Sequence, residues 1–374
     1  MKTRAAVSYE PGEPLVVENL EIDEPRAGEV RVKMAAVGLC HSDYHVMAGD
    51  RPVGMRPMVL GHEGAGVVDA VGPGVTRIKP GDHVVLMFIP SCGKCHWCLS
   101  GMTHSCVLSA NIAKGPQLDG TYRLRNTEGQ DVGQFCMIGA FSEYAVVNQD
   151  SVCVIDKSNP LEVACLLGCG VVGGFGAAVN RAKVTPGSSV LVIGVGGVGM
   201  NVIQGARVAG ATTIIAADIV DQKLAWAKTF GATHTINSDK ADVVTEVMEI
   251  TDGTGVDFAF EAISSPATVG QAFAATAKMG VVVVIGLTPA AVESLPISPL
   301  NLVLSQKTLM GTLYGTSNAP VEIPKLLHLY KHGQIKLDEL ITQTYTLDEI
   351  NQGYADMLAG KNIRGVLTFG YLEQ

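Results

Sequence analysis

The sequence predicts an α/β protein of two domains, one mostly β and one built on a doubly wound parallel sheet. Its 374 residues exceed the roughly 150 that a single domain usually holds. Hydrophobic residues make up 47% and charged residues 17%, a balance too apolar and too weakly charged for a disordered chain. After about residue 185, short β-branched runs alternate with helical segments, which is typical of a parallel sheet covered by helices on both faces.

The first 150 residues predict the mostly β domain. Short strands are expected at 30–38, 65–74 and 82–88, separated by loops rich in glycine and proline. After residue 315 the sequence returns to helices, around KLLHLYKHG and LDEINQGYADMLAGK. A strand-like VLTF at 366–369 closes the chain.

Six strands are expected in the parallel sheet. They lie at 190–193, 212–218, 233–237, 256–262, 281–286 and 308–314. The stretch 184–206 has no charge at a length that could span a bilayer, but glycine and polar residues interrupt it. It therefore predicts a buried strand, a tight turn and a buried helix, and no membrane partner is expected.

The charge balance argues against nucleic acid as a partner. The formal charge is −9, from 27 Lys and Arg against 36 Asp and Glu, and no basic run interrupts it. The opening MKTRAAVSYEPGEP has charges with no apolar segment behind them, unlike a secretory signal. The expected compartment is therefore the cytoplasm.

A glycine-rich turn follows the first strand of the predicted parallel sheet. Its spacing is G-x-G-x-x-G, and a segment with helical periodicity comes next. The first glycine makes the tight turn, the second lets backbone approach a pyrophosphate, and the third lets helix meet strand. The helix N-terminus adds positive potential. The candidate cofactor-binding residues are Gly194, Gly196, Gly197, Val198 and Gly199.

Asp218 lies nineteen residues beyond Gly199, at the end of the second predicted strand. A carboxylate there accepts hydrogen bonds from both adenosine ribose hydroxyls and repels a 2′-phosphate, so NAD is favoured over NADP. The alternative is a structural glycine turn in an unrelated α/β protein, with Asp218 as a helix cap.

Four cysteines in SCGKCHWCLSGMTHSC have the spacing C-x2-C-x2-C-x7-C and predict a closed, tetrahedral structural zinc site. The ligands are Cys92, Cys95, Cys98 and Cys106. An iron–sulfur cluster is the alternative, although the fourth spacing and the lack of a following proline argue against it. Four unrelated thiols, or replacement of one thiolate by His96 or His104, are further alternatives.

A second, open zinc site cannot be read from spacing alone. Its candidates Cys40, His62 and Cys169 are far apart in the sequence, each beside a glycine in a loop-like context. Taken singly, each is better explained as a buried free cysteine or a solvated histidine.

Taken together, these motifs resemble the zinc-dependent medium-chain alcohol dehydrogenases over essentially the whole chain. GLCHSD, LGHEGAG, CGKCHWC, LLGCG, GVGGVG and IRGVLTF occur in the family's order. The resemblance implies a GroES-like, mostly β catalytic domain from 1–170 with 315–374 and a Rossmann NAD-binding domain from 171–314. It also implies a homodimer or homotetramer, paired through Rossmann edge strands near 300–316.

The resemblance also assigns the metal residues. Cys40, His62 and Cys169 match the three protein ligands of a catalytic zinc, which would make two zinc ions per subunit. Glu63 matches a carboxylate that can approach that metal. Asp43 matches the residue that hydrogen-bonds the zinc histidine and fixes its tautomer.

Further residues match cofactor and substrate positions of the family. Ser42 and His45 match a relay that carries a proton to solvent through the nicotinamide ribose. His41 and Arg364 fall where the family holds the pyrophosphate, and Lys223 where it assists the ribose-binding carboxylate. The positions that match the substrate pocket are Phe88, Phe135, Cys136, Leu287 and Leu313.

The implied reaction is reversible hydride transfer between a primary aliphatic, allylic or aromatic alcohol and NAD+, giving the aldehyde. Zinc lowers the pKa of the bound alcohol, and Ser42 and His45 carry its proton away. The alternative is glutathione-dependent formaldehyde (S-hydroxymethylglutathione) dehydrogenase. That branch has acidic residues where Arg51 and Val53 stand, and an arginine beyond the last structural cysteine that is missing here. His45 replaces the tyrosine usual in that branch.

Two alternatives come from other classes: a protein that binds NAD without turnover, and a zinc-free quinone reductase. Together, Cys40, His62, Cys169 and Ser42 argue against both, because neither needs an open metal site.

Overall fold

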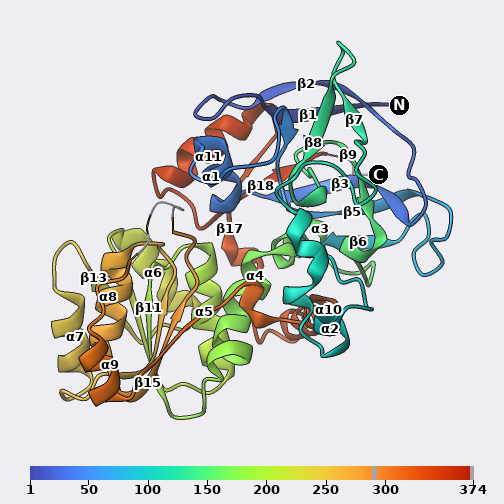
Figure 1. The fold of residues 1–374 in the computed structure, drawn as a ribbon. Coiled ribbons are helices and arrows are strands. Elements are labelled where there is room, and N and C mark those ends of the chain that lie inside the picture. Colours follow the sequence, from blue (N-terminus) through green and yellow to red (C-terminus); the bar gives the residue numbers. More distant parts are fainter. Residues whose placement is uncertain (289–291, 293, 371–374) are drawn as a thin grey trace. The chain divides into compact units, whose positions relative to one another are not determined.

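The computed structural model describes residues 1–288, 292 and 294–370, which form two compact units (Figure 1). The first unit comprises Met1–Cys169, Asn318–His328 and Leu337–Gln374, and the second Gly170–Ser317 and Leu329–Lys336. The predicted domains, 1–170 with 315–374 and 171–314, differ from this division chiefly at Leu329–Lys336.

Hydrogen bonds to helix α5 (Gly197–Val208) explain why that segment groups with the second unit. The Gln204 side chain accepts from the Lys336 N–H at 2.6 Å and donates to the Lys336 carbonyl at 3.0 Å. Sequence patterning could not show this side-chain contact across 132 residues.

The first unit is mostly β, as predicted. One sheet closes into a small barrel of β1 (Lys2–Ser8), β2 (Val16–Ile22), β7 (Leu124–Arg125), β8 (Asp131–Gln134) and β4 (Met58–Val59). The other contains, in order, β10 (Val152–Ile155), β6 (His83–Leu86), β5 (Glu63–Val71), β3 (Glu29–Gly38), β18 (Arg364–Thr368) and β17 (Ile341–Tyr345). Strand β9 (Tyr144–Asn148) also pairs with β3.

The centre of the larger sheet positions the candidate site. Gly38, the last residue of β3, pairs with Glu63, the first of β5, and with Val366 of β18. A Cβ at Gly38 would lie 2.5 Å from Glu63 Oε2 and 2.9 Å from Arg364 Nη2. Glycine at this position therefore leaves room for two charged side chains, from the strands on either side of β3, to meet.

The helices of the first unit are short, and the sequence patterns missed the first of them. They are α1 (His41–Ala48), α2 (His96–Leu99), α3 (Leu161–Ala164), α10 (Ala319–Lys331), which continues into the second unit, and α11 (Ile350–Leu358). Helix α1 has the sequence HSDYHVMA, which lacks an apolar periodicity. Its C-cap is Gly49, whose φ of +87° suits glycine.

The second unit is a six-stranded parallel sheet, and all six predicted strands are present. Their order is β13 (His234–Asn237), β12 (Thr213–Asp218), β11 (Ser189–Ile193), β14 (Val256–Glu261), β15 (Thr276–Val284) and β16 (Thr308–Gly311). The chain moves outward from β11 in both directions, so the topological switch point lies between β11 and β14. In such sheets, ligands bind at the carboxyl ends of the strands at that point.

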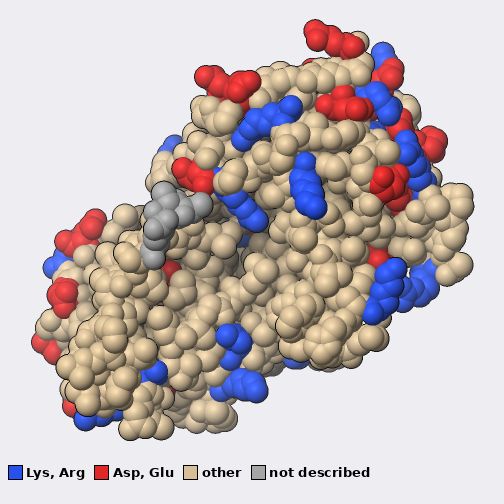
Figure 2. All heavy atoms as spheres, viewed as in Figure 1, with Lys and Arg blue, Asp and Glu red and all other residues tan. Residues whose placement is uncertain are grey.

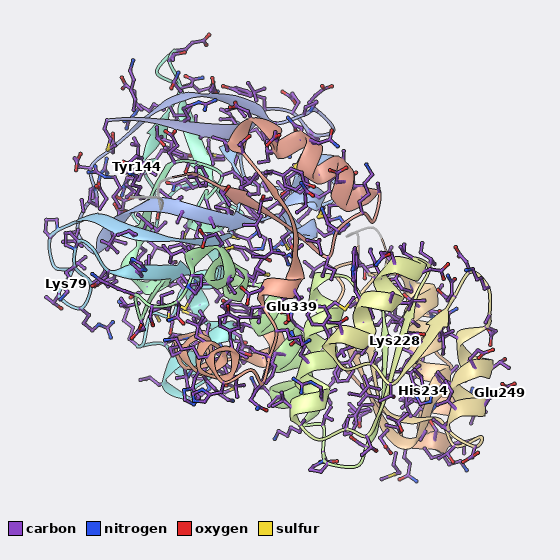
Figure 3. The ribbon with its side chains drawn as sticks, turned by 180° about the vertical axis from the view of Figure 1, so that it is seen from behind. Lys79, Tyr144, Lys228, His234, Glu249 and Glu339 are labelled. Carbon is purple, nitrogen blue, oxygen red and sulfur yellow. The ribbon has the colours of Figure 1, made fainter. Side chains whose placement is uncertain are left out.

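Helix α4 (Gly170–Gly176) precedes the first of these strands. The helices between successive strands are α5, α6 (Asp221–Phe230), α7 (Val243–Ile250), α8 (Pro266–Ala275) and α9 (Pro299–Ser305). Leu191, Ile215 and Val282 are buried in the core beneath α7 and α8. Lys228 of α6, His234 of β13 and Glu249 of α7 are exposed at the outer edge (Figure 3).

The uncharged stretch 184–206 forms β11, the glycine turn and most of α5, as predicted. Within the described residues, no single helix has the length and apolar composition needed to cross a membrane. One bent pair, Leu161–Gly168 with Gly170–Ala182, meets those two criteria.

A buried ion pair ties the barrel to the larger sheet. The Arg123 guanidinium is 0% exposed and binds the Glu29 carboxylate through both oxygens, at 2.8 and 2.6 Å. It also donates to Asp119 at 2.8 Å and to the Thr121 hydroxyl at 2.6 Å. Every charge in this cluster has a partner, which makes removal of one member costly.

We expect Arg123→Ala to lower the free energy of unfolding by about 3–5 kcal/mol, because it leaves Glu29 buried without a cation. The control is Arg125→Ala. Arg125 also binds a carboxylate, Asp23 at 2.8 Å, but its side chain is 35% exposed, so a loss of about 0–1 kcal/mol is expected. Urea denaturation of both variants measures the difference, and equal losses would contradict this account.

Candidate active site

Four ligand atoms from distant parts of the first unit converge. One ligand atom from each of Cys40, His62, Glu63 and Cys169 lies within 4.8 Å of the others. Cys40 directly precedes α1. His62 directly precedes β5, and Glu63 is the first residue of that strand. Cys169 follows the short 3-10 helix Cys165–Gly168. The fold thus brings together the four residues that the resemblance had assigned to the catalytic metal.

Two glycines permit this close approach. Gly61 has a φ of +88°, and a Cβ there would lie 2.7 Å from the Phe141 amide. A Cβ at Gly168 would lie 2.7 Å from the Leu86 carbonyl and 3.2 Å from Glu63 Cα. Gly61 therefore lets the His62 segment pack against Phe141, and Gly168 lets the Cys169 segment pack against the His62 segment.

Asp43 holds the imidazole of His62. Its Oδ2 lies 2.9 Å from His62 Nδ1, and its Oδ1 accepts a hydrogen bond from the Gly61 N–H at 2.9 Å. Burial raises the pKa of Asp43. Burial acts to lower the pKa of His62, but Asp43 and Cys40 raise it well above its usual value. With Nδ1 directed at Asp43, Nε2 is the nitrogen left for a metal.

The two cysteines differ in acidity. A hydrogen bond from the Cys169 thiol lowers the pKa of Cys40 well below its usual value, and His62 adds to this effect. The same hydrogen bond raises the pKa of Cys169. The protein's own groups thus already favour a thiolate at Cys40, the form in which cysteine binds a metal.

Glu63 and Arg364 form a fully buried ion pair beside this cluster. Burial raises the pKa of Glu63 to about 7, against the attraction of Arg364. Its second oxygen, Oε1, has no hydrogen-bond partner among the described residues. Arg364 had been expected at the cofactor pyrophosphate; in the first unit its guanidinium is paired with Glu63, and the pyrophosphate role stays a prediction.

The expected proton relay lies on α1. Ser42 and His45 are three residues apart and therefore share a helix face. His45 Nδ1 lies 3.1 Å from Asp50 Oδ2, and the ring of His41 is 6.3 Å from that of His45. Asp50 was not predicted from the sequence; the signal would have been a carboxylate two residues past the end of α1.

Phe88 and Phe135 flank His62, with T-shaped ring contacts at 5.6 and 5.8 Å between centroids. Cys136 is buried beside Phe135, with an unusual φ of +56°. Leu287 and Leu313, the other expected pocket residues, are exposed positions of the second unit.

A second cluster contains Cys92, Cys95, Cys98 and Cys106, again with ligand atoms within 4.8 Å of one another. The sulfurs of Cys92 and Cys98 are 3.9 Å apart. A tetrahedron with metal–sulfur bonds of about 2.3 Å places its sulfurs roughly 3.8 Å apart, so the donor set fits one zinc ion. His96 and His104 are not members of this group.

In the second unit, the glycine turn has the geometry that a pyrophosphate site needs. Gly194 has a φ of +87°, and a Cβ at Gly199 would lie 2.0 Å from the Gly194 carbonyl oxygen. A Cβ at Gly196 would meet no atom within 4 Å, so that backbone faces open space. Helix α5 begins at Gly197 and Val198, which adds its N-terminal amides to the turn.

Asp218 ends β12 and is buried. Its carboxylate accepts hydrogen bonds from the Val195 and Val220 N–H groups, each at 3.0 Å. Asp218 therefore also shapes the glycine turn, which motif reasoning had not foreseen. Lys223, on α6, makes no side-chain hydrogen bond or ion pair with any described residue.

Comparison with known proteins agrees with the description of the first unit and with that of the second. The family description "Alcohol dehydrogenase GroES-like domain" matches residues 26–157, and "Zinc-binding dehydrogenase" matches residues 197–332. A putative alcohol dehydrogenase D from Mycobacterium tuberculosis is 46% identical, covering 98% of this chain and all of the relative. The chain belongs to the zinc-dependent medium-chain alcohol dehydrogenase family, so its predicted GroES-like and Rossmann architecture is confirmed.

Other relatives show the range of the family. An NDMA-dependent alcohol dehydrogenase from Amycolatopsis methanolica is 45% identical, over 98% of this chain and 99% of that protein. The crystal structure of benzyl alcohol dehydrogenase from Acinetobacter calcoaceticus is 36% identical with a TM-score of 0.93, over 99% and 100% of the two chains. Two further solved structures, each 25% identical, contain NADP and NADH respectively. These similarities support zinc and a nicotinamide cofactor.

Two glycine variants test the turn. Gly196→Ala should change the free energy of unfolding by less than about 0.5 kcal/mol, because its Cβ meets nothing, yet weaken NADH binding tenfold or more by blocking the pyrophosphate. Gly199→Ala should weaken binding and also cost about 1–3 kcal/mol, because its Cβ overlaps the Gly194 carbonyl. NADH fluorescence titration and thermal unfolding measure the two effects. Unchanged NADH affinity in Gly196→Ala would show that the pyrophosphate lies elsewhere.

Proposed function

We propose that the protein is an NAD-dependent zinc alcohol dehydrogenase that interconverts primary alcohols and aldehydes. The observation that carries the proposal is the convergence of Cys40, His62 and Cys169 in the first unit. Two sulfurs and one nitrogen leave one position of a tetrahedral zinc for substrate, as in catalytic zinc sites. A protein that only bound NAD would have no use for such a site.

The protein's own residues would orient the reactants and remove a proton. Zinc, when bound, makes the alcohol more acidic. Asp43 fixes the His62 ring, so the ligand nitrogen keeps its direction. Ser42 accepts the alcohol proton and passes it towards His45, which Asp50 orients from the edge of α1 at 3.1 Å. The nicotinamide cofactor, when bound, would supply the acceptor for the hydride of the alcohol carbon.

NAD is proposed as the cofactor because of Asp218. Solved relatives contain NADH or NADP, so similarity alone does not favour one of them. A carboxylate at the end of β12 binds two ribose hydroxyls and repels a 2′-phosphate. Lys223 lies five residues further on and could reduce that repulsion, but it cannot replace the hydrogen bonds.

The proposed substrates are small primary alcohols, with aromatic ones included. Phe88 and Phe135 give the cluster an apolar, aromatic border. The similarity to a benzyl alcohol dehydrogenase agrees with this. Arg51 and Val53 stand where the formaldehyde branch has acidic residues, so we propose no dependence on glutathione.

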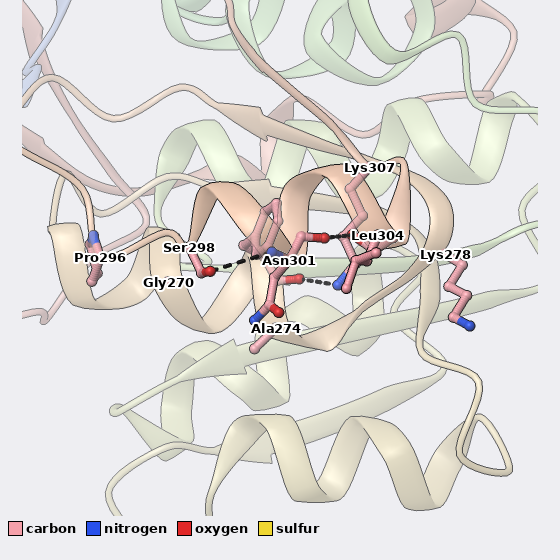
Figure 4. Close-up of a pocket in the computed structure, with 10 residues that line it drawn as sticks. Gly270, Ala274, Lys278, Pro296, Ser298, Asn301, Leu304 and Lys307 are labelled. Carbon is pink, nitrogen blue, oxygen red and sulfur yellow. Dashed lines mark hydrogen bonds between the residues drawn. The ribbon is translucent and has the colours of Figure 1, made fainter.

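We propose a homodimer or homotetramer. Strand β16 is at the edge of its sheet, where backbone groups can pair with another chain. Leu300, Val303 and Leu304 of the neighbouring α9 are 64%, 71% and 67% exposed. A pocket of about 520 Å³ opens beside α9 (Figure 4). The exposed apolar side chains of α9 support pairing between copies.

We also propose a cytoplasmic protein without nucleic-acid or membrane partners. Acidic and basic side chains are interspersed on the face shown in Figure 2. This distribution and the net charge of −9 offer little attraction to phosphate backbones.

Two zinc ions per subunit are expected, with different lability. Mild chelation should abolish turnover before the protein unfolds, because the site with a solvent position should release metal before the four-thiolate site does. Cys169→Ala should lose activity and one zinc while staying folded. Its matched control, Cys95→Ala, should mainly lower thermal stability, because metal binding there supports local folding. Metal analysis of the unmodified protein showing a single zinc would contradict the count of two, and iron with sulfide would contradict zinc at the four-cysteine cluster.

A panel of alcohols tests the proposed reaction. We expect benzyl, allylic and aliphatic primary alcohols to reduce NAD+ without added glutathione, with little reduction of NADP+. Asp218→Gly should lower kcat/KM for NAD+ and narrow its advantage over NADP+, since the carboxylate both binds ribose and repels phosphate. NADH absorbance measures each rate. Parallel assays with and without NDMA test whether this protein depends on NDMA, as the name of the Amycolatopsis relative states for that enzyme. Formaldehyde oxidation only with glutathione would indicate the other branch.

A further inference from the structure

We propose that Arg51 selects alcohols that carry a negatively charged group, such as a carboxylate on an aromatic ring. This inference rests on the proposed alcohol dehydrogenase function and adds a substrate class to it. Arg51 lies three residues beyond the end of α1, next to Asp50. Its guanidinium carbon is 5.9 Å from the centroid of the Phe135 ring.

Phe135 connects Arg51 to the metal cluster. The Phe135 ring is buried and lies 5.8 Å from the His62 ring in a T-shaped contact. One aromatic ring therefore separates the Arg51 guanidinium from a candidate zinc ligand. The charge of Arg51 also reaches the neighbouring thiol: burial raises the pKa of Cys136 to about 12, and His62 and Arg51 oppose that rise.

The guanidinium of Arg51 has hydrogen-bonding capacity that the described residues do not use. No carboxylate or carbonyl of the described part of the chain accepts a hydrogen bond from it. Its neighbour Asp50 is directed to His45, at 3.1 Å. The other cation near the cluster, Arg364, is paired with Glu63. Arg51 is thus a cation close to the reacting centre with its donors available.

The cation–π contact with Phe135 leaves the donors of Arg51 free for an anionic ligand. A guanidinium on an aromatic face keeps its N–H groups in its own plane, where they bind a carboxylate through two parallel hydrogen bonds. Arg51 is half-buried, so its attraction for an anion is screened less than that of a fully exposed pair. An alcohol that reaches from the cluster along Phe135 would present its far end to Arg51. A carboxylate there would be bound, and an uncharged ring would not gain this contact.

The test compares 4-(hydroxymethyl)benzoate with benzyl alcohol, which differ by the carboxylate. The readout is the ratio of their kcat/KM values in the unmodified enzyme and in Arg51→Gln. We expect the unmodified enzyme to prefer the anionic alcohol, and the ratio to fall about tenfold in the variant, the size of one charge-assisted contact. Arg51→Lys keeps the charge but lacks the planar fork, so it should retain part of the preference.

Binding of 4-formylbenzoate gives a readout independent of turnover, and its affinity should fall in Arg51→Gln in the same proportion. Arg125→Gln is the matched control: Arg125 is paired with Asp23 in the barrel, so the ratio should not change. Equal kcat/KM for the two alcohols in the unmodified enzyme, or an unchanged ratio in Arg51→Gln, would overturn the role of Arg51 while leaving the dehydrogenase function standing. Failure to oxidise either alcohol would instead contradict the proposed function on which the inference rests.

Discussion

Burial of charge beside the ligand cluster is the constraint on which the first unit depends. Cys40, Asp43, His62, Glu63 and Arg364 are all buried, and an isolated ion in that environment would cost several kcal/mol. In the fold, each buried charge has a partner that offsets this cost. Asp43 pairs with His62, Glu63 with Arg364, and the Cys40 sulfur with the Cys169 thiol. The pairs connect residues up to 301 positions apart in sequence, Glu63 and Arg364 being the most distant. The closing strand β18 is therefore part of the site as well as of the sheet.

Small residues make these pairings possible. Gly38 of β3 gives Glu63 and Arg364, from the strands on either side, room to meet. Gly168 lets the Cys169 segment approach the His62 segment, and Gly61 lets the His62 segment pack against Phe141. The same principle operates in the second unit, where Gly199 lets α5 begin directly against the carbonyl of Gly194. In both units, a few polar groups form the candidate sites. Glycines, which have no side chain, leave the space in which these groups lie.

The sequence predicted the second unit well, because its six strands and its glycine turn are local patterns. It also predicted the four-cysteine cluster, whose ligands lie within fifteen residues. The open ligand set was different: no local pattern joins Cys40, His62 and Cys169, and only resemblance to a family suggested them together. Helix α1 was missed because its polar, histidine-rich sequence has no apolar periodicity. Asp50 and the Glu63–Arg364 pair were missed because side-chain partners are set by tertiary packing rather than by spacing along the chain.

Asp218 links two properties that are usually treated as separate. Its carboxylate holds the Val195 and Val220 amides, and the same group is the one expected to meet the adenosine ribose. A change of cofactor preference at this position would therefore also disturb the loop that receives the diphosphate. A change of the protein's preference to NADP should then require at least two substitutions. One would admit the 2′-phosphate, and another would restore a hydrogen-bond acceptor for the Val195 and Val220 amides. A change from NAD to NADP by single substitutions would therefore pass through variants that bind either cofactor poorly. This favours retention of the NAD preference.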